Sequence, residues 1–370
     1  MTKFPSHHLY IHTPFCAKKC PYCAFYSVAT KPDWDEYAAG IIKAIGEQPK
    51  CAVPTIFFGG GTPSLMPPMV LERILSAIHK HFNVDPNAEI TIEINPGTLK
   101  VPFAGEGVDG VAGRGSGKLT DYKALGINRV SIGAQSFNDR DLQFLGRIHT
   151  AAEARQTIEA AQNLDFKVSA DFIYALPGQT LTDIADLCAE IKKIGLKHAS
   201  LYELTIEPGT PFATKFPPKG GGAQGAGWFD PDNRTDFFTE IGKHLRRYEV
   251  SNYAEPGFEC QHNSGIWAGE PYIGLGAYAA GRLFDGNQWS EQLSGVLTPL
   301  STRARAIEKV ITGLRTIRGV ELTNDVREIL NFDYINANPS YFCHIPSATL
   351  TLTPQGLIIL DFLLPYVIKS

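Results

Sequence analysis

The 370-residue chain has no apolar run of about 18 or more residues, so we expect no membrane-spanning helix. Its first residues have no apolar stretch of the kind found in a signal peptide. The formal net charge of -4 gives no basic surplus, so no nucleic-acid partner is expected. The seven cysteines are an odd number with no regular spacing beyond the first three. We therefore expect a reducing, cytoplasmic location and no disulfide framework.

Three of the cysteines are concentrated in one short segment: Cys16, Cys20 and Cys23 form a CxxxCxxC motif. Three thiolates on one loop can hold three irons of a [4Fe–4S] cluster. No fourth cysteine follows nearby, so one iron would be open to a small molecule. A zinc site made by His12 with the same cysteines is the alternative. We favour the cluster, because zinc motifs usually pair two ligand groups that lie far apart in the sequence.

Short apolar, β-branched segments alternate with longer helix-like segments. The expected strands cover residues 8–12, 55–58, 89–94, 129–135, 167–174 and 199–206. The expected helices cover residues 33–46, 68–81, 151–163 and 182–195. This alternation predicts an α/β fold with a parallel sheet and crossover helices. Six strands are consistent with an open, partial (β/α)6 relative of the TIM barrel, whose site lies at the carboxyl ends of the strands.

The character of the chain changes after a helix expected at residues 232–247. We therefore expect a barrel over residues 1–247 and a smaller mixed α/β domain over residues 248–370, with a helix at 304–315. The glycine-rich stretches 103–118 and 217–227 predict mobile surface loops. The first lacks GxxxxGK[ST], so a phosphate loop is not favoured. Cys51, Cys188 and Cys343 are expected to be core residues.

Seven motifs, taken together and in this order, resemble the radical S-adenosylmethionine (SAM) superfamily. They resemble most closely the branch that contains oxygen-independent coproporphyrinogen III oxidase and the heme chaperone HemW. The motifs are CxxxCPYC at 16–23, FFGGGTPS at 57–64, EINP at 93–96, SIGAQSF at 131–137, LGRIH at 145–149, DFIYALP at 171–177 and EPGTP at 207–211. The resemblance implies a partial barrel followed by a small winged-helix-like domain.

The same resemblance implies that SAM binds the open iron of the cluster. The implied SAM contacts are Tyr10, Tyr22, Gly59, Gly60, Gly61, Thr62, Glu93, Gln135, Arg147 and Asp171. The glycine run would approach the methionyl amine, Glu93 would bind ribose hydroxyls, and Arg147 could pair with the methionyl carboxylate through two hydrogen bonds. A glycine run after a strand can also form a tight turn without a ligand, and that alternative stays open.

The residues after Cys23 resemble the chaperone type of this branch, because the oxidases have a further cysteine there. The resemblance implies a protein that binds heme and passes it to acceptor proteins. It also implies an electron donor protein and peripheral membrane contact through the acceptors. The alternative is an enzyme that decarboxylates coproporphyrinogen III, and the sequence leaves open whether the chain is an enzyme. Ile266 and Ala280 depart from the family pattern, which commonly has tyrosine and histidine there.

A heme iron needs an axial donor, most often His, Cys, Met or Tyr. His262 is the candidate that we expect, with His149 and Cys260 as alternatives. His262 could instead serve only as a hydrogen-bonding residue in a loop between domains.

Overall fold

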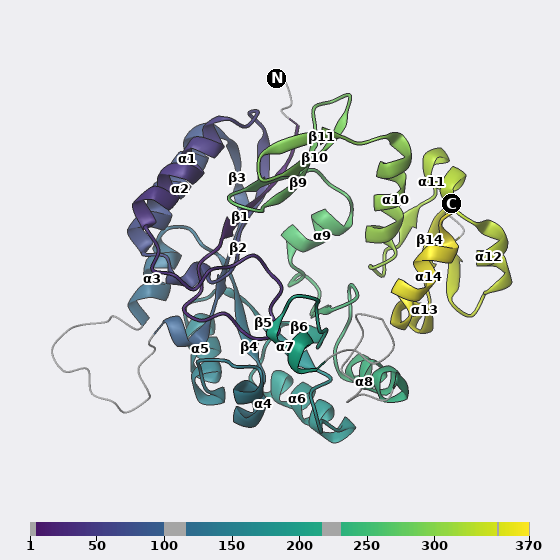
Figure 1. Ribbon diagram of the computed structural model, residues 1–370, viewed down its shortest axis with the longest axis horizontal. Helices are drawn as coiled ribbons and strands as arrows, with labels where there is room; N and C mark the ends of the chain where they lie inside the picture. The colour runs from purple at the N-terminus through teal and green to yellow at the C-terminus, as the bar shows by residue number, and fades with distance from the viewer. Residues whose placement is uncertain (1–4, 100–115, 217–230, 346–347, 370) are drawn as a thin grey trace.

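The computed structural model describes residues 5–99, 116–216, 231–345 and 348–369 (Figure 1). The second glycine-rich stretch, and residues 103–115 of the first, lie outside the described residues. Within those ranges no helix is both long and apolar enough to cross a membrane.

Six parallel strands form the centre of the molecule, as the sequence predicted. They are β1 (His8–Thr13), β2 (Ala52–Gly60), β3 (Asn83–Ile94), β4 (Arg129–Gln135), β5 (Lys167–Tyr174) and β6 (His198–Glu203), paired in that order. The helices between them are α1 (Trp34–Gly46), α2 (Pro68–His81), α3 (Ser116–Ala124), α4 (Asp139–Phe144), α5 (Ala151–Asn163) and α6 (Leu181–Lys193). Figure 1 shows these helices along the outside of the curved sheet.

Five further strands extend this sheet at both edges. β7 (Asn252–Ala254) pairs antiparallel with β6, and β8 (Tyr272–Leu275) pairs parallel with β1. β9 (Ala280–Phe284), β10 (Trp289–Leu293) and β11 (Val296–Pro299) continue as antiparallel strands. Among the described strands, β7 and β11 are the two ends of the sheet order and do not pair with each other, so the barrel is open.

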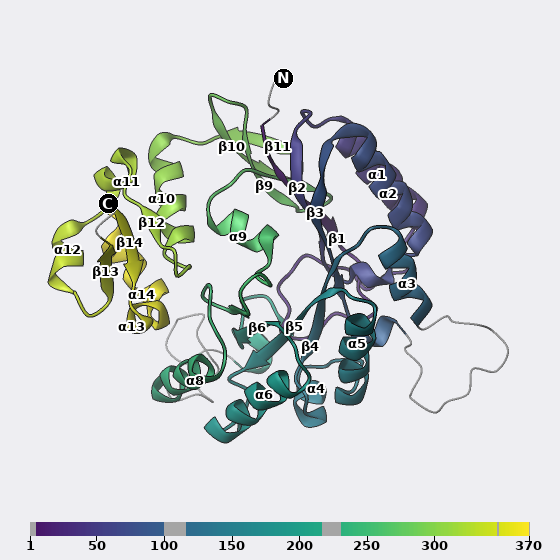
Figure 2. The ribbon, with the colours of Figure 1, turned by 180° about the vertical axis from the view of Figure 1, so that it is seen from behind.

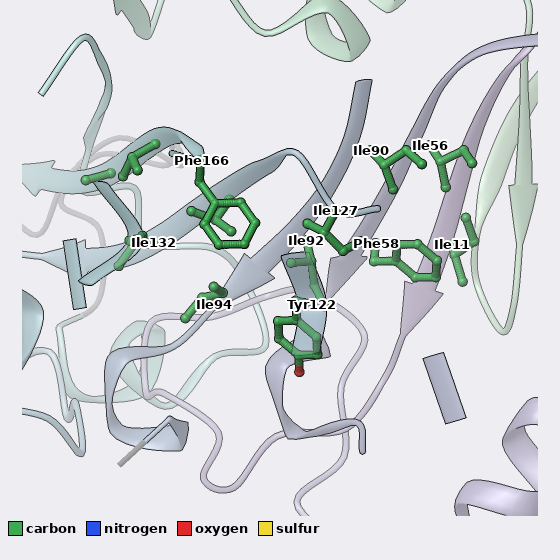
Figure 3. Packing of buried hydrophobic residues seen from close by; sticks show 14 of the residues in the cluster. Ile11, Ile56, Phe58, Ile90, Ile92, Ile94, Tyr122, Ile127, Ile132 and Phe166 are labelled. Atoms are coloured by element: carbon green, nitrogen blue, oxygen red, sulfur yellow. The ribbon is translucent and has the colours of Figure 1, made fainter. Parts of the chain in front are cut away.

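The strands alternate between an apolar outer face and a polar inner face. Ile11, Phe58, Ile92 and Ile132 are fully or almost fully buried under the helices (Figure 3). The residues between them in sequence point to the opposite face, because successive side chains of a strand alternate. The inner face is therefore rich in polar residues, and this is the face on which a site can form.

A second apolar core is built mainly from the last 70 residues, whose helices and strands lie to one side of the barrel in Figure 2. It joins a small antiparallel sheet of β12 (Val320–Glu321), β14 (Thr349–Leu352) and β13 (Phe342–Ile345) to five helices. These are α10 (Thr302–Gly313), α11 (Asn324–Ile329), α12 (Phe332–Ala337), α13 (Pro354–Ile358) and α14 (Leu360–Val367). Strands and helices mix here as expected of a small α/β unit.

The expected division at residue 247 stays a prediction, because packing does not measure which parts fold alone. Strands β7 to β11 follow that residue yet belong to the barrel sheet, while Phe238 in α8 (Pro231–His244) packs into the second core. Cys51 and Cys188 are buried as predicted. The prediction for Cys343 is wrong: it lies exposed on β13, a strand at the edge of the small sheet.

Candidate functional site

The three motif cysteines lie on the loop between β1 and α1, and each is a half-buried free thiol. The Cys23 amide donates a hydrogen bond to the Cys20 carbonyl at 3.1 Å, and the Cys16 amide donates one to the Val28 carbonyl at 2.9 Å. These bonds fold the loop back on itself at the carboxyl end of β1. Burial raises the pKa of the Cys23 thiol. A bound metal would therefore have to displace its proton.

Two of these sulfurs accept hydrogen bonds from side chains outside the loop. Thr62 Oγ1 donates to Cys16 Sγ at 3.6 Å, and Arg147 Nη1 donates to Cys20 Sγ at 3.4 Å. Hydrogen bonds to cysteine sulfur are among the features that set the reduction potential of an iron–sulfur cluster. Both donors were predicted from the sequence as SAM contacts, and the structure places them against the cysteines.

The donor set fits a cluster better than a zinc ion. His12 Nε2 lies 2.9 Å from the Tyr26 carbonyl and therefore donates to it, which leaves Nδ1 to accept from the Tyr10 hydroxyl at 3.1 Å. His12 then has no free lone pair for zinc. Across the described ranges, no three His, Cys, Asp or Glu side chains surround a single ion position. A cluster does not need such convergence, because each cysteine binds a different iron.

The glycine run consists of the last two residues of β2, Gly59 and Gly60, which pair with β1, and of Gly61, which follows the strand. Gly60 has a φ of 112°, which favours glycine, and its amide donates to Glu93 Oε2 at 3.0 Å. A Cβ atom on Gly60 would lie 2.5 Å from the His12 ring, and one on Gly61 would lie 2.7 Å from the Phe15 carbonyl oxygen. Packing against the protein thus explains why glycine is needed here. The contact of this glycine run with SAM stays a prediction.

Arg147 connects the cysteine loop to the end of β4. Its Nη2 donates to the Gly133 carbonyl at 3.0 Å, while its Nε has no hydrogen-bond partner although it is buried. A Cβ atom on Gly133 would meet both the Gln135 amide at 2.8 Å and Arg147 Nη2 at 3.3 Å, so the two side chains lie together over that glycine. Gln135 itself has a φ of 66°, an unusual conformation that turns the chain at the strand end. Burial raises the pKa of Tyr22, and the charge of Arg147 beside it opposes that shift.

Inside the barrel, farther from the cysteine loop than Arg147, lies a polar chamber of about 250 Å³. Tyr10, Glu93, Asp171 and His262, all candidates from the sequence, line it together. Burial, together with the charge of Asp171, raises the pKa of Glu93 to about 8. Burial also raises the pKa of Asp171, which accepts from Ser131 Oγ at 3.1 Å. The two carboxyl groups thus share a site in which both cannot easily be charged.

An ion pair that the sequence did not reveal closes the lower end of the chamber. Glu89 and Arg129 are almost completely buried and lie 3.5 Å apart. Glu89 Oε1 also accepts from the amides of Gln261 at 2.8 Å and His262 at 3.2 Å, which begin helix α9 (Gln261–Trp267). Figure 1 shows α9 on the inner side of the sheet. This carboxylate anchors α9 to β3 across more than 170 positions of sequence, which is why local patterns missed it.

His262 lies inside the barrel, where a hydrogen-bonded chain fixes its orientation. Its Nδ1 lies 2.7 Å from Thr55 Oγ1, which lies 2.7 Å from His8 Nδ1, and His8 Nε2 lies 2.9 Å from the exposed carboxylate of Glu270. In the tautomer in which His8 Nε2 donates to Glu270 and His8 Nδ1 accepts from Thr55, the Thr55 hydroxyl accepts from His262 Nδ1. His262 Nε2 is then an acceptor, and it has no partner in the chamber. Burial lowers the pKa of His262 to about 3.

This geometry does not favour His262 as a heme ligand, which stays an untested prediction. His262 is 2% exposed, and its ring stacks on Phe57 with centroids 5.0 Å apart, so a macrocycle cannot reach it without moving α9. The two alternatives are also buried. His149 has both ring nitrogens within 3.2 Å of oxygen atoms, and the Cys260 thiol donates to Glu89.

Comparison with the sequences of known proteins gives three findings. The family model described as the radical SAM superfamily matches residues 10–191. The chain is 35% identical to the heme chaperone HemW of Escherichia coli over 76% of this chain and 72% of the relative. It is 30% identical to the mitochondrial radical S-adenosyl methionine domain-containing protein 1 of Danio rerio over 99% of this chain and 88% of the relative.

Among solved structures, coproporphyrinogen III oxidase of Escherichia coli, described as a radical SAM enzyme, has the same fold. The TM-score is 0.75 over 98% of this chain and 90% of the other, at 18% identity. At this identity the similarity extends to the fold only.

Proposed function

Since the chain belongs to the radical SAM superfamily, in the group of its HemW relatives, we propose that it binds a [4Fe–4S] cluster, SAM and heme and delivers heme to acceptor proteins. The relatives named heme chaperone support this function over that of an oxidase. They share about a third of their residues with the chain over most of its length. An electron donor protein and the heme acceptors are the partners that the proposal requires.

The observation that carries the choice is the size of the chamber. Pockets that enclose a drug-sized ligand measure about 300–1,000 Å³. The chamber of about 250 Å³ is smaller, because α9 fills the space beside it. A tetrapyrrole that served as a substrate would have to enter the barrel interior next to SAM. A chaperone can hold heme outside the barrel, which this arrangement favours.

In this proposal the residues of the chain have separate tasks. Cys16, Cys20 and Cys23 bind three irons, and Arg147 and Thr62 donate hydrogen bonds to two of the sulfurs. When bound, the reduced cluster can supply one electron to SAM. The unpartnered Nε of Arg147 is available for the methionyl carboxylate. Glu93 and Asp171 line the chamber where the adenosyl group would lie.

Two anaerobic assays on the reconstituted protein test the proposal. In the first, ferric heme is added and its transfer to an apo-hemoprotein is followed by absorbance. In the second, the protein is incubated with coproporphyrinogen III, SAM and a reductant. We expect transfer in the first and no protoporphyrinogen in the second. Formation of protoporphyrinogen would establish the oxidase alternative, and absence of heme binding would refute the chaperone.

A further inference from the structure

Tyr278, in the turn between β8 and β9, has a backbone conformation that is costly for a tyrosine. Its φ is 59°, in the left-handed region that bulky residues rarely adopt. Its amide donates to Ser294 Oγ at 2.9 Å, and the Ser294 amide donates to the Ala279 carbonyl at 3.0 Å, so the turn is pinned from the neighbouring hairpin. Residues held in this way are concentrated at binding sites, where the surrounding structure compensates for the strain.

The strained turn carries the Tyr278 ring onto the cysteine loop. The ring stacks on Tyr26, three residues after Cys23, with centroids 4.0 Å apart and an angle of 25° between the planes. Even so, Tyr278 is 62% exposed, and Phe25, which precedes Tyr26 in the sequence, is 72% exposed. Burying apolar rings stabilises a protein, so rings this open gain little by themselves. Their arrangement suits a flat, apolar ligand that covers them.

The same loop carries the charges that a heme would need. Lys18 and Lys19 are exposed between the cluster cysteines, and Lys19 Nζ donates to the Phe25 carbonyl at 3.2 Å. The two propionates of heme are anions, so cations at one edge of an aromatic surface match the molecule. On the other side, Gly276 and Ala277 of the pinned turn, with Ser294 of the hairpin that pins it, line a mainly apolar cavity of about 710 Å³. The turn between β8 and β9 therefore lies between this apolar cavity and the cysteine loop that carries Lys18 and Lys19.

An axial donor must also reach the iron. His149, His262 and Cys260, the donors expected from the sequence, are all buried and held by other contacts. A phenolate oxygen is an established heme ligand. Tyr278 is exposed and belongs to the surface just described, so it meets the requirement that the three buried residues do not.

We propose that Tyr278 is an axial ligand of heme, which packs against the exposed edge of the Tyr26–Tyr278 pair so that the Tyr278 oxygen meets the iron, with the propionates toward the loop that carries Lys18 and Lys19. The phenol proton is released to solvent, and the oxygen forms a bond to the ferric iron, so no redox step is needed. This inference rests on the proposed heme binding and specifies its site. It also places heme next to the cluster loop, on the outside of the barrel.

Titration of ferric heme into the anaerobic protein, followed by absorption and electron paramagnetic resonance, tests this site. We expect a high-spin spectrum typical of tyrosinate ligation in the wild type. Tyr278→Phe keeps the ring and removes the oxygen, and should lose that spectrum and weaken heme binding at least about tenfold, the effect of losing one strong ligand. Cluster absorbance and SAM binding should not change.

Control variants separate ligation from nonspecific adsorption of heme. Tyr366 is also exposed, and it stacks on Tyr334 with centroids 5.4 Å apart in the second core. Tyr366→Phe should leave the heme spectrum unchanged, and so should His262→Ala. Tyr278→Gly relieves the strain, so its melting temperature should equal or exceed that of the wild type, which shows that the fold survives.

The outcomes distinguish a failure of the proposed heme chaperone function from a failure of Tyr278 as the heme ligand. If the wild type binds no heme, the proposed function fails. If the wild type binds heme and Tyr278→Phe keeps the same spectrum and affinity, Tyr278 is not the ligand, while the chaperone function stands. If His262→Ala loses the heme spectrum and Tyr278→Phe keeps it, the axial ligand is His262 on α9, and the surface site at Tyr278 is refuted.

Discussion

The buried pair of Glu89 and Arg129 gives the sharpest test of how α9 is held in the barrel. Changing Glu89 to Gln keeps the shape of the side chain and one oxygen acceptor for the α9 amides. It removes the negative charge, and Arg129, which is 1% exposed, is left as an unpaired cation. Arg129 Nη1 keeps its hydrogen bond to the Phe258 carbonyl at 3.0 Å, but a carbonyl carries no negative charge, and Nη2 has no hydrogen-bond partner.

The size of the effect follows from this burial. Removing one partner of a buried ion pair typically costs about 3–5 kcal/mol, because the other charge remains in a poorly polarisable interior. We therefore expect Glu89→Gln to lower the free energy of unfolding by about that amount. Glu190→Gln is the matched control, since Glu190 pairs with Arg155 at 2.6 Å but both side chains are 30% exposed or more. Its cost should be about 0–1 kcal/mol, as for other exposed pairs.

Urea unfolding of the anaerobic protein measures both values. The fluorescence of Trp267, the last residue of α9, should report whether the helix leaves the barrel. A double variant, Glu89→Gln with Arg129→Met, removes both charges and should recover part of the loss. A loss below about 1 kcal/mol in Glu89→Gln, equal to that of the control, would refute the reasoning.

Three further predictions concern the cofactors and pH. Cys20→Ala should abolish the brown visible absorbance of the reconstituted cluster, and stoichiometric zinc without iron in the wild type would contradict the cluster assignment. Arg147→Ala should weaken SAM binding by roughly 1.5–3 kcal/mol, about 10–150-fold, measured by calorimetry with unchanged iron content; unchanged affinity would show that the carboxylate binds elsewhere. The pKa of Glu93 is raised from 4.5 to about 8 in the fold, so the unfolded chain loses this proton first as pH rises. Its contribution to the free energy of unfolding should be complete below pH 4.5, fall by at most about 1.4 kcal/mol per pH unit up to pH 8, and stay lost above that. Denaturant titrations across this pH range should show that the free energy of unfolding changes less with pH in Glu93→Gln than in the wild type. An identical pH dependence in the two proteins would exclude Glu93 as the group that titrates.

Much of the barrel could be predicted from the sequence, because its signals are local. The bounds of β4, β5, α2 and α5 agree with the expected ranges to the residue. Each strand is an apolar, β-branched run, and each helix shows its apolar face at helical spacing. The cysteine motif is equally local, since its eight positions, from Cys16 to Cys23, lie on one loop. Motifs at strand ends were correctly expected to meet, because parallel strands present their carboxyl ends at one edge.

Only the tertiary structure decided how distant and short segments complete the site. β8 has only four residues, too few for a clear periodic signal, yet it pairs with β1 more than 260 positions earlier. Separation in sequence also hid the Glu89–Arg129 pair, 40 positions apart, and the bonds from Glu89 to α9, which span more than 170 positions and bury His262 instead of offering it to a ligand. Tyr278 likewise shows no pattern in sequence, because its exposure and its stacking on Tyr26 depend on a pinned turn. Side-chain alternation and motif spacing depend on neighbours in the chain, whereas burial and charge pairing depend on neighbours in space.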